Sequence, residues 1–185
     1  RGLWVIVDEA YYPFGAATAL GMLPGCERLI ITRTLSKSGA LAGLRLGYAI
    51  AAPAVIARLD ALRMPYNVNA LATAAALALL EEPAWLTERV AEISAERERV
   101  AGRLAELDGV RVWLAVANFL LVELPVPDAA AIGVAMAERG VLVRHYPHPR
   151  LRRCLRITIG RAAENDRMRA TLVAALAGAR TEVRG

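Results

Sequence analysis

The fold is decided by the stretch Leu29-Ile30-Ile31-Thr32-Arg33-Thr34-Leu35-Ser36-Lys37-Ser38-Gly39. It opens with a short apolar run, typical of a strand buried in a sheet, and continues into a polar segment that contains Lys37. Lys37 is the only lysine, and all the other strongly basic side chains are arginine. Because a lysine amine can lose its proton and form a Schiff base and an arginine cannot, we predict amine chemistry in a loop after a strand. The alternative is a stray surface lysine in a chain that prefers arginine.

Two further apolar runs, Leu3–Val7 and Leu46–Ile50, predict two more strands of the same kind. The first of these runs ends abruptly at Asp8-Glu9. All three runs have the pattern of strands buried in a parallel sheet, and such sheets bind ligands outside the carboxyl ends of their strands. Asp8 and Lys37 both follow such an end, so we expect them to share one binding site.

Helical periodicity begins at Pro53 and continues in two further segments. Residues Ala70–Leu80 predict an Ala/Leu-rich helix that is largely buried. Residues Ala84–Leu107 predict a long amphipathic helix, with a proline in its first turn and Asp108-Gly109 as its stop signal. We expect this helix to link two domains, residues 1–82 and 83–185.

The second half of the chain predicts a small α+β domain. Its strands are expected at Val110–Trp113, Asn118–Val122, Val141–Val143 and Cys154–Ile159, and its helices at Ala129–Arg139 and Ala163–Ala177. In the last strand apolar and polar residues alternate, so Arg156 should point away from the core. The fold class is therefore α/β for the first domain, with a mainly parallel sheet, followed by the α+β domain.

Composition excludes several classes of protein. With 56% apolar and 22% charged residues the chain predicts a packed globular protein, and its net charge of +5 comes from arginines mixed with acids, which argues against nucleic-acid binding. The apolar stretches are too short to span a membrane and no signal peptide opens the chain, so we expect a cytoplasmic protein. Cys26 and Cys154 predict reduced thiols, and neither they nor the loop residues His145 and His148 have the spacing of a metal site.

Four blocks of sequence resemble the pyridoxal-phosphate-dependent aminotransferases of fold type I, most closely the histidinol-phosphate aminotransferase family. The blocks are Val7-Asp8-Glu9-Ala10-Tyr11, Arg33-Thr34-Leu35-Ser36-Lys37, Leu41-Ala42-Gly43-Leu44-Arg45-Leu46-Gly47-Tyr48 and Cys154-Leu155-Arg156-Ile157-Thr158. Their order and spacing make the match specific, although each block alone is weak. The family is about twice as long, so the chain resembles its second half.

The resemblance implies a binding site for pyridoxal 5'-phosphate. The lysine that matches Lys37 holds the cofactor aldehyde as an internal aldimine and then moves the substrate proton, which requires a buried amine of lowered pKa. Asp8 matches the carboxylate that pairs with the pyridine nitrogen, and Tyr11 matches the phenol that bonds the ring oxygen. Ser36 and Arg45 match groups that bind the cofactor phosphate.

The resemblance also implies the substrate contacts. Arg156 matches the arginine that binds the substrate carboxylate, and Arg144 matches a further cation that could bind a distal phosphate. Asn118 matches a family asparagine, with a structural role and a contact both open. The implied reaction is transfer of an amino group between L-histidinol phosphate, or a related amino substrate, and 2-oxoglutarate in histidine biosynthesis, by a homodimer.

Three alternatives stay open: a threonine-phosphate decarboxylase, a ligand-sensing domain of a transcription regulator, and a non-catalytic remnant. Two other motifs are set aside, because the chain has no phosphate-binding loop to accompany Asp8-Glu9 and has Thr34 where a Ser-x-x-Lys hydrolase needs serine. The family's first half supplies part of the cofactor site. We therefore expect these 185 residues alone to show weak or no catalysis and an exposed sheet edge.

Overall fold

The computed structural model describes residues 2–15, 17–113 and 115–182. The chain divides into two compact units, residues 1–91 and 92–185, and their border lies within the long helix α3 (Pro83–Ala105). The expected linking helix is therefore present. The assignment of residues 1–82 to a cofactor-binding domain and 83–185 to a small domain stays a prediction.

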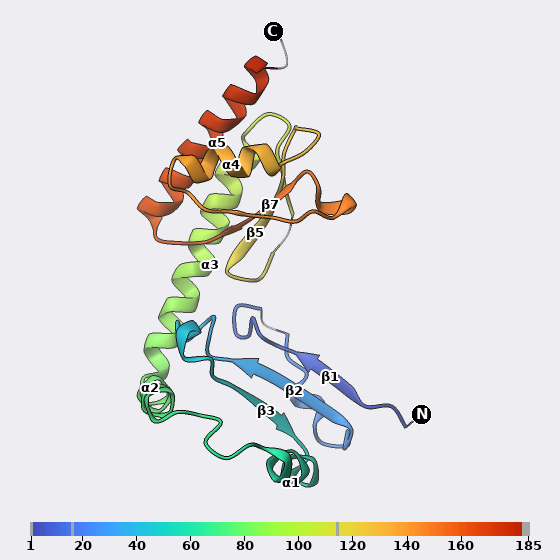
Figure 1. The fold of residues 1–185 in the computed structure, drawn as a ribbon. Helices are drawn as coiled ribbons and strands as arrows, with labels where there is room; N and C mark the ends of the chain where they lie inside the picture. Colours follow the sequence, from blue (N-terminus) through green and yellow to red (C-terminus); the bar gives the residue numbers. More distant parts are fainter. Residues whose placement is uncertain (1, 16, 114, 183–185) are drawn as a thin grey trace. The chain divides into compact units, whose positions relative to one another are not determined.

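The first unit contains a three-stranded sheet in the order β1-β2-β3 (Figure 1). Its strands are β1 (Val5–Asp8), β2 (Leu29–Thr34) and β3 (Gly47–Ala51). β1 and β2 are parallel, with Asp8 opposite Thr32, so the carboxyl ends of both strands lie at the same edge. This is the arrangement that the sequence predicted for Asp8 and the segment that contains Lys37.

Two details of this sheet differ from the prediction. β3 runs antiparallel to β2, because the short connection at 35–46 contains only the 3-10 helix η2 (Ala42–Leu44) and lacks the helical crossover that a parallel return requires. β1 lies at an edge and is largely exposed, with Ile6 67% exposed, whereas Ile31 of the central strand is fully buried. The expected exposed edge is thus present, but the expected burial of β1 is wrong.

The helices of the first unit are α1 (Pro53–Leu62) and α2 (Ala70–Glu81), and the 3-10 helix η1 (Leu20–Met22) precedes β2. α2 has the predicted bounds to within a residue, and Asn69 caps it by accepting a hydrogen bond from the Ala72 N–H at 2.8 Å. The predicted burial of α2 is wrong, since only Ala72 and Ala76 are buried and Leu71 is 69% exposed. The helix packs through a stripe of small residues, which its apolar composition did not reveal.

The second unit is an α+β layer, as predicted. Its sheet has the order β4-β5-β7-β6 and is antiparallel throughout. The elements are β4 (Arg111–Trp113), β5 (Phe119–Glu123), α4 (Ala130–Glu138), β6 (Arg144–His145), η3 (Pro149–Leu151), β7 (Cys154–Thr158) and α5 (Ala162–Glu182).

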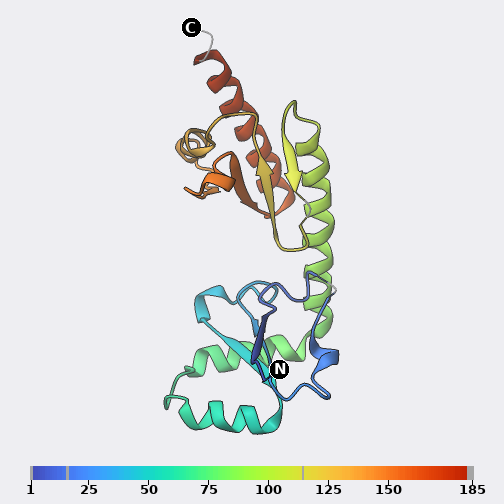
Figure 2. The same cartoon turned by 90° about the vertical axis from the view of Figure 1, so that its right-hand side faces the viewer.

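The core of the second unit lies on one face of this sheet. Leu120 of β5 pairs with Ile157 of β7, and both side chains are buried together with residues of α3, α4 and α5. Figure 2 shows the ribbons of these strands and helices from a second side. The buried residues of α3 are Arg97, Val100 and Leu104. The buried guanidinium of Arg97 donates a hydrogen bond to the Ala117 carbonyl at 3.1 Å. Arg156 alternates with the buried residues of β7 and lies on the other face, as predicted.

One predicted strand is displaced. The expected strand 141–143 is instead β6, two residues long at Arg144–His145. The Val141 N–H bonds to the Met136 carbonyl at 3.0 Å, and Gly140 has a φ of +74°, which is a helix-terminating arrangement. Val141 therefore completes the end of α4 and cannot pair in the sheet.

Candidate functional site

The Lys37 loop is joined to the segment that follows Asp8. Ser38 is buried and its hydroxyl donates to the Tyr12 carbonyl at 3.3 Å. The Lys37 amine lies 5.7 Å from the centre of the Tyr11 ring. Asp8 is exposed at the end of β1, where its carboxylate accepts a hydrogen bond from the Ala10 N–H at 3.0 Å. A carboxylate, a phenol ring and an amine thus gather at the carboxyl edge of the parallel pair.

Thr34 shapes the loop that carries Ser36 and Lys37. Its hydroxyl oxygen lies 2.9 Å from the Ser36 hydroxyl and 3.1 Å from both the Ser36 N–H and the Leu46 carbonyl. The Leu35 N–H also donates to the Leu46 carbonyl at 3.1 Å. These bonds tie the start of the loop to the segment before β3, so Ser36 is held at a defined place.

The amine of Lys37 is not buried, contrary to the expectation from the resemblance. Lys37 is exposed among the residues that the structure describes. The amine lies over the Tyr11 ring. A ligand can therefore reach the amine from solvent.

Arg45 occupies an unusual backbone position. Its φ of 56° and ψ of 38° lie in the left-handed region, which is uncommon for residues other than glycine. Its guanidinium donates to the Ala42 carbonyl at 3.1 Å and is exposed. Ala40, in the same connection, also has a positive φ, of 55°. Such conformations cluster at binding sites, where surrounding contacts hold them.

A buried ion pair that the sequence analysis did not single out lies beside Asp8. Arg33 Nε and its terminal nitrogen each lie 2.9 Å from Glu9 Oε2, and the side chains are only 9% and 7% exposed. Glu9 also accepts from Thr18 Oγ1 at 2.9 Å and the Ala19 N–H at 2.6 Å. The Arg33 guanidinium stacks on the Tyr12 ring, 3.6 Å from its centre.

The surroundings keep both members of this pair charged. Burial would raise the pKa of Glu9, but hydrogen bonds from Ala19, Arg33 and Thr18 lower that pKa below its usual value. Burial would lower the pKa of Arg33, but hydrogen bonds with Tyr48 and Glu9 raise it. Glu9 and Arg33 each lie in a block of sequence that resembles the family, but the sequence does not show that they are partners. Only the pairing of β1 with β2 brings them together.

In the second unit the two predicted substrate arginines lie side by side. Arg144 of β6 is the register partner of Arg156 of β7. The Arg156 guanidinium lies 5.1 Å from the Phe119 ring centre and 6.0 Å from that of Tyr146, and Arg144 lies 5.5 Å from Tyr146. Arg156 Nε is buried and has no hydrogen-bond partner among the described residues. The sequence analysis predicted both arginines but did not single out Tyr146, whose ring lies near both guanidinium groups.

The remaining candidates have structural contacts. The Asn118 carbonyl accepts from the Ile159 N–H at 2.9 Å. His145 lies within β6 and bonds the Arg152 carbonyl at 3.1 Å, so its expected place in a surface loop is wrong. His148 is exposed and accepts from the Arg150 N–H at 3.2 Å.

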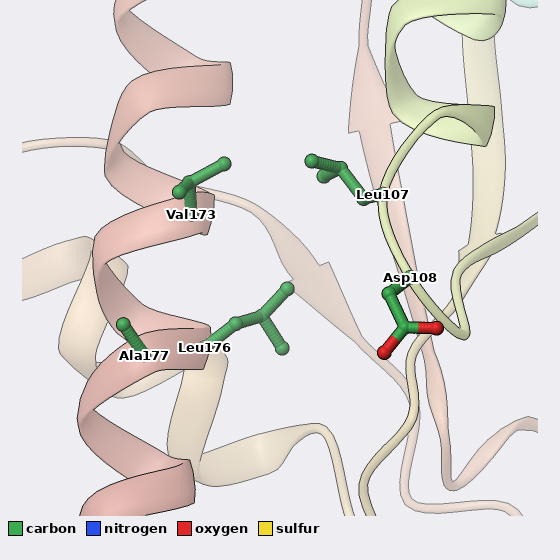
Figure 3. Close-up of a pocket in the computed structure, with 5 residues that line it drawn as sticks. All are labelled: Leu107, Asp108, Val173, Leu176 and Ala177. Atoms are coloured by element: carbon green, nitrogen blue, oxygen red, sulfur yellow. The ribbon is translucent and has the colours of Figure 1, made fainter.

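A separate cavity of about 330 Å³ lies between α5 and the turn that follows α3 (Figure 3). Leu107 and Val173 point toward each other across it, and Leu176, Ala177 and Asp108 complete its wall. It contains none of the predicted site residues. Residues 2–15, 17–113 and 115–182 include no cluster of His, Cys, Asp and Glu that could hold a metal, and none of their helices is long and apolar enough to cross a membrane.

Known proteins resemble this chain over most of its length. The family model for aminotransferase class I and II matches residues 1–176. The chain belongs to this aminotransferase family. Its relatives include histidinol-phosphate aminotransferase 1 of Burkholderia lata, 42% identical over 176 residues, and the histidinol-phosphate aminotransferase of Roseiflexus castenholzii, 41% identical over 163 residues. These matches cover 94% and 86% of this aminotransferase chain but 48% and 44% of the relatives, so it spans about half of their length.

Solved structures agree with the fold of the aminotransferase chain. Histidinol-phosphate aminotransferase from Sinorhizobium meliloti, in complex with pyridoxal-5'-phosphate, matches with a TM-score of 0.84 and 29% identity, over 95% of this chain and 49% of that one. L-threonine-O-3-phosphate decarboxylase from Porphyromonas gingivalis matches with a TM-score of 0.81 and 28% identity, over 92% and 54%. The predicted fold class, the fold type I aminotransferase scaffold, is thereby confirmed.

Proposed function

We propose that this chain forms part of a pyridoxal-phosphate-dependent aminotransferase that acts on histidinol phosphate or a related phosphorylated amino substrate, with 2-oxoglutarate as the partner oxo acid. The observation that carries the proposal is the position of the chain's only lysine, Lys37, in a loop bonded to the segment after Asp8. Its amine beside Tyr11 and the nearby Asp8 carboxylate are the groups that this cofactor requires. The residues present thus fit the cofactor.

When bound, pyridoxal phosphate supplies an aldehyde for covalent attachment to an amine and a ring that accepts electrons from the substrate α-carbon. Asp8 would hold a proton on the ring nitrogen, and Tyr11 would donate a hydrogen bond to the ring oxygen. Ser36 and Arg45 would bind the phosphate, the former through a hydroxyl held by Thr34. Lys37 Nζ would accept the α-proton of the substrate and return it.

Arg156 and Arg144 would bind the anionic groups of the substrate. Their guanidinium groups occupy paired positions on one face of the sheet, and no hydrogen-bond partner of Arg156 Nε lies among the residues that the structure describes. A carboxylate or phosphate can accept two parallel bonds from one such group. A phosphorylated amino acid or amino alcohol matches this pair of cations better than a neutral amine.

The relatives are about twice as long as this chain, so we infer that turnover by the 185 residues alone is weak. Pairing as a homodimer and a cytoplasmic location are likewise proposals that follow the family. The binding of pyridoxal phosphate is the step that these residues can be tested for directly.

The test combines spectroscopy with mapping. The chain is incubated with pyridoxal phosphate, its absorption is recorded, and borohydride followed by peptide mass analysis locates the modified residue. We expect a visible band and a modification at Lys37, both absent from Lys37→Arg, which keeps the charge but not the reactive amine. Modification of the amino terminus in place of Lys37 would contradict the proposal.

A second candidate function is decarboxylation of a phosphorylated amino acid, favoured by the likeness to L-threonine-O-3-phosphate decarboxylase. Both reactions would use Lys37 and the two arginines. A preparation with turnover distinguishes them, because transamination converts 2-oxoglutarate to glutamate whereas decarboxylation releases carbon dioxide without consuming an oxo acid. Because turnover by this chain alone is expected to be weak, binding of pyridoxal phosphate by these 185 residues without product does not distinguish the two reactions from a ligand-sensing domain.

A further inference from the structure

The ion pair between Glu9 and Arg33 joins the two parts of the candidate cofactor site. Glu9 directly follows Asp8, and its N–H bonds the Thr32 carbonyl at 2.8 Å, which extends the β1–β2 pairing by one residue beyond Asp8. Arg33 lies on the neighbouring strand, four residues before Lys37. The pair therefore joins the end of β1, which carries Asp8, to the end of β2, which leads into the loop with Lys37.

A second path leads from the same pair to the lysine loop. The Arg33 guanidinium covers the Tyr12 ring, and the Tyr12 carbonyl accepts the hydrogen bond from Ser38, the residue after Lys37. Arg33 also donates to Thr18 at 2.9 Å. A shift of Arg33 would move Tyr12, and with it the anchor of the lysine loop.

Stability alone is a poor explanation for this cluster. Removing two charges from water costs several kcal/mol per ion before their attraction offsets it, and apolar pairs of similar volume often serve the fold as well. What an ion pair with fixed forked geometry adds is a defined distance and orientation between the strands that it joins. Both side chains have nearly all of their polar atoms engaged, so the geometry is rigid.

We propose that Glu9 and Arg33 are positioning residues that hold the Asp8 carboxylate and the Lys37 amine in register for the cofactor. The inference rests on the proposed function for the identity of the ligand. The part that concerns the lysine loop itself can be tested without any ligand. Both residues would act through Asp8 and Lys37, without touching the reacting atoms.

The experiment compares four forms of the chain: wild type, Glu9→Gln, the apolar double variant Glu9→Leu/Arg33→Met, and Asp60→Asn. The last removes one partner of the exposed pair Asp60–Arg63 in the same unit and serves as the matched control. Hydrogen exchange of the ligand-free chain is followed in peptides over residues 35–41. The rate of borohydride-trapped labelling of Lys37 by pyridoxal phosphate is the second readout.

We expect faster exchange over residues 35–41 in both cluster variants, and labelling of Lys37 slower by about 10- to 100-fold, because small displacements of reacting groups have effects of that size. The control should match wild type in both readouts. The double variant should keep the wild-type melting temperature, which separates positioning from loss of fold. Where Glu9→Gln does not fold, Arg33→Lys, which keeps the charge but loses the fork, takes its place.

A double variant with wild-type melting temperature, wild-type exchange over 35–41 and wild-type labelling would overturn the inference and leave the pair as a simple connection between strands. Failure of the proposed function gives a different pattern. Wild-type chain without Lys37 labelling contradicts cofactor binding, while the exchange data still decide whether Glu9 and Arg33 order the lysine loop.

Discussion

Arg144 and Arg156 are direct register partners across β6 and β7, so two guanidinium groups leave one face of the sheet from opposed positions. Like charges in such positions are destabilising. Both groups lie near the Tyr146 ring, which attracts cations, but the ring leaves their charge uncompensated. An anion between them would compensate it.

Arg156→Gln should therefore raise the melting temperature in phosphate-free buffer and reduce the stabilisation that added phosphate gives to wild type. Arg111→Gln is the control, because the register partner of Arg111 is Glu123 and its removal should lower stability slightly. Thermal melts with and without phosphate measure both effects. An equal response to phosphate in all three proteins would argue against an anion site at Arg156.

Asp8→Asn tests the carboxylate at the end of β1. Asparagine retains an oxygen that can accept the Ala10 N–H bond, so the fold should be unaffected. Only the negative charge is lost, and with it the proposed partner of the cofactor nitrogen. In a preparation with turnover we expect a rate lower by at least about 100-fold, the size typical of a lost electrostatic contact in a reaction centre. Asp60→Asn, an exposed carboxylate of the same unit, should retain the wild-type rate.

Local patterns predicted those parts of the structure that local physics controls. Alternation in β7 placed Arg156 away from the core, and helical periodicity predicted the long helix α3. The gathering of Tyr11 and Lys37 followed from two parallel strands that end at one edge. Each of these inferences needed only side-chain periodicity or the adjacency of two strands.

Other features depend on partners that are distant in sequence. The direction of β3 is set by how the chain returns from Lys37, and the burial of α2 by which of its faces finds a neighbour. The Glu9–Arg33 pair exists because strand pairing brings together residues 24 positions apart. Composition treats Leu71 and Ala72 alike, although one is exposed and the other is buried.

Glu96 makes the stability of the second unit dependent on pH. A hydrogen bond from Arg99 lowers the pKa of Glu96 to about 2. Burial acts in the opposite direction, and a hydrogen bond from Asn165 lowers the pKa further. Its pKa is ordinarily 4.5, so the unfolded chain takes up a proton first as the pH falls. The stabilisation is complete above pH 4.5 and is lost progressively toward pH 2.

Glu96→Gln should accordingly remove about 1–2 kcal/mol of the free energy of unfolding at neutral pH and flatten its dependence on pH in that acid range. Chemical denaturation at a series of pH values measures this. Glu98→Gln is the control, since the Glu98 side chain is 78% exposed and its Oε1 lies 3.8 Å from the Arg97 guanidinium, beyond hydrogen-bond distance. Parallel curves for wild type and Glu96→Gln would show that the contact with Arg99 contributes no linkage.

Arg45 combines a strained backbone with a proposed phosphate contact, and two substitutions separate these properties. Arg45→Gly removes the guanidinium and suits a φ of 56°, whereas Arg45→Ala removes it and keeps the strain. We expect the glycine variant to be more stable than the alanine variant by about 1 kcal/mol. Both should bind pyridoxal phosphate more weakly than wild type to the same extent. Unequal affinities would mean that the backbone, not the cation, matters for binding.

Two glycines test how closely the lysine loop is packed. A Cβ at Gly39 would come within 2.6 Å of the Leu79 side chain and 2.9 Å of the Leu35 carbonyl, whereas a Cβ at Gly102 meets nothing within 4 Å. The backbone carbonyl cannot yield as a flexible side chain can, so Gly39→Ala should cost about 1–3 kcal/mol of stability. Gly102→Ala lies on the exposed side of α3 and should add about 1 kcal/mol through helix propensity. Because Gly39 lies two residues after Lys37, the first variant should also label more slowly with pyridoxal phosphate, and normal labelling would indicate that the loop tolerates displacement from α2.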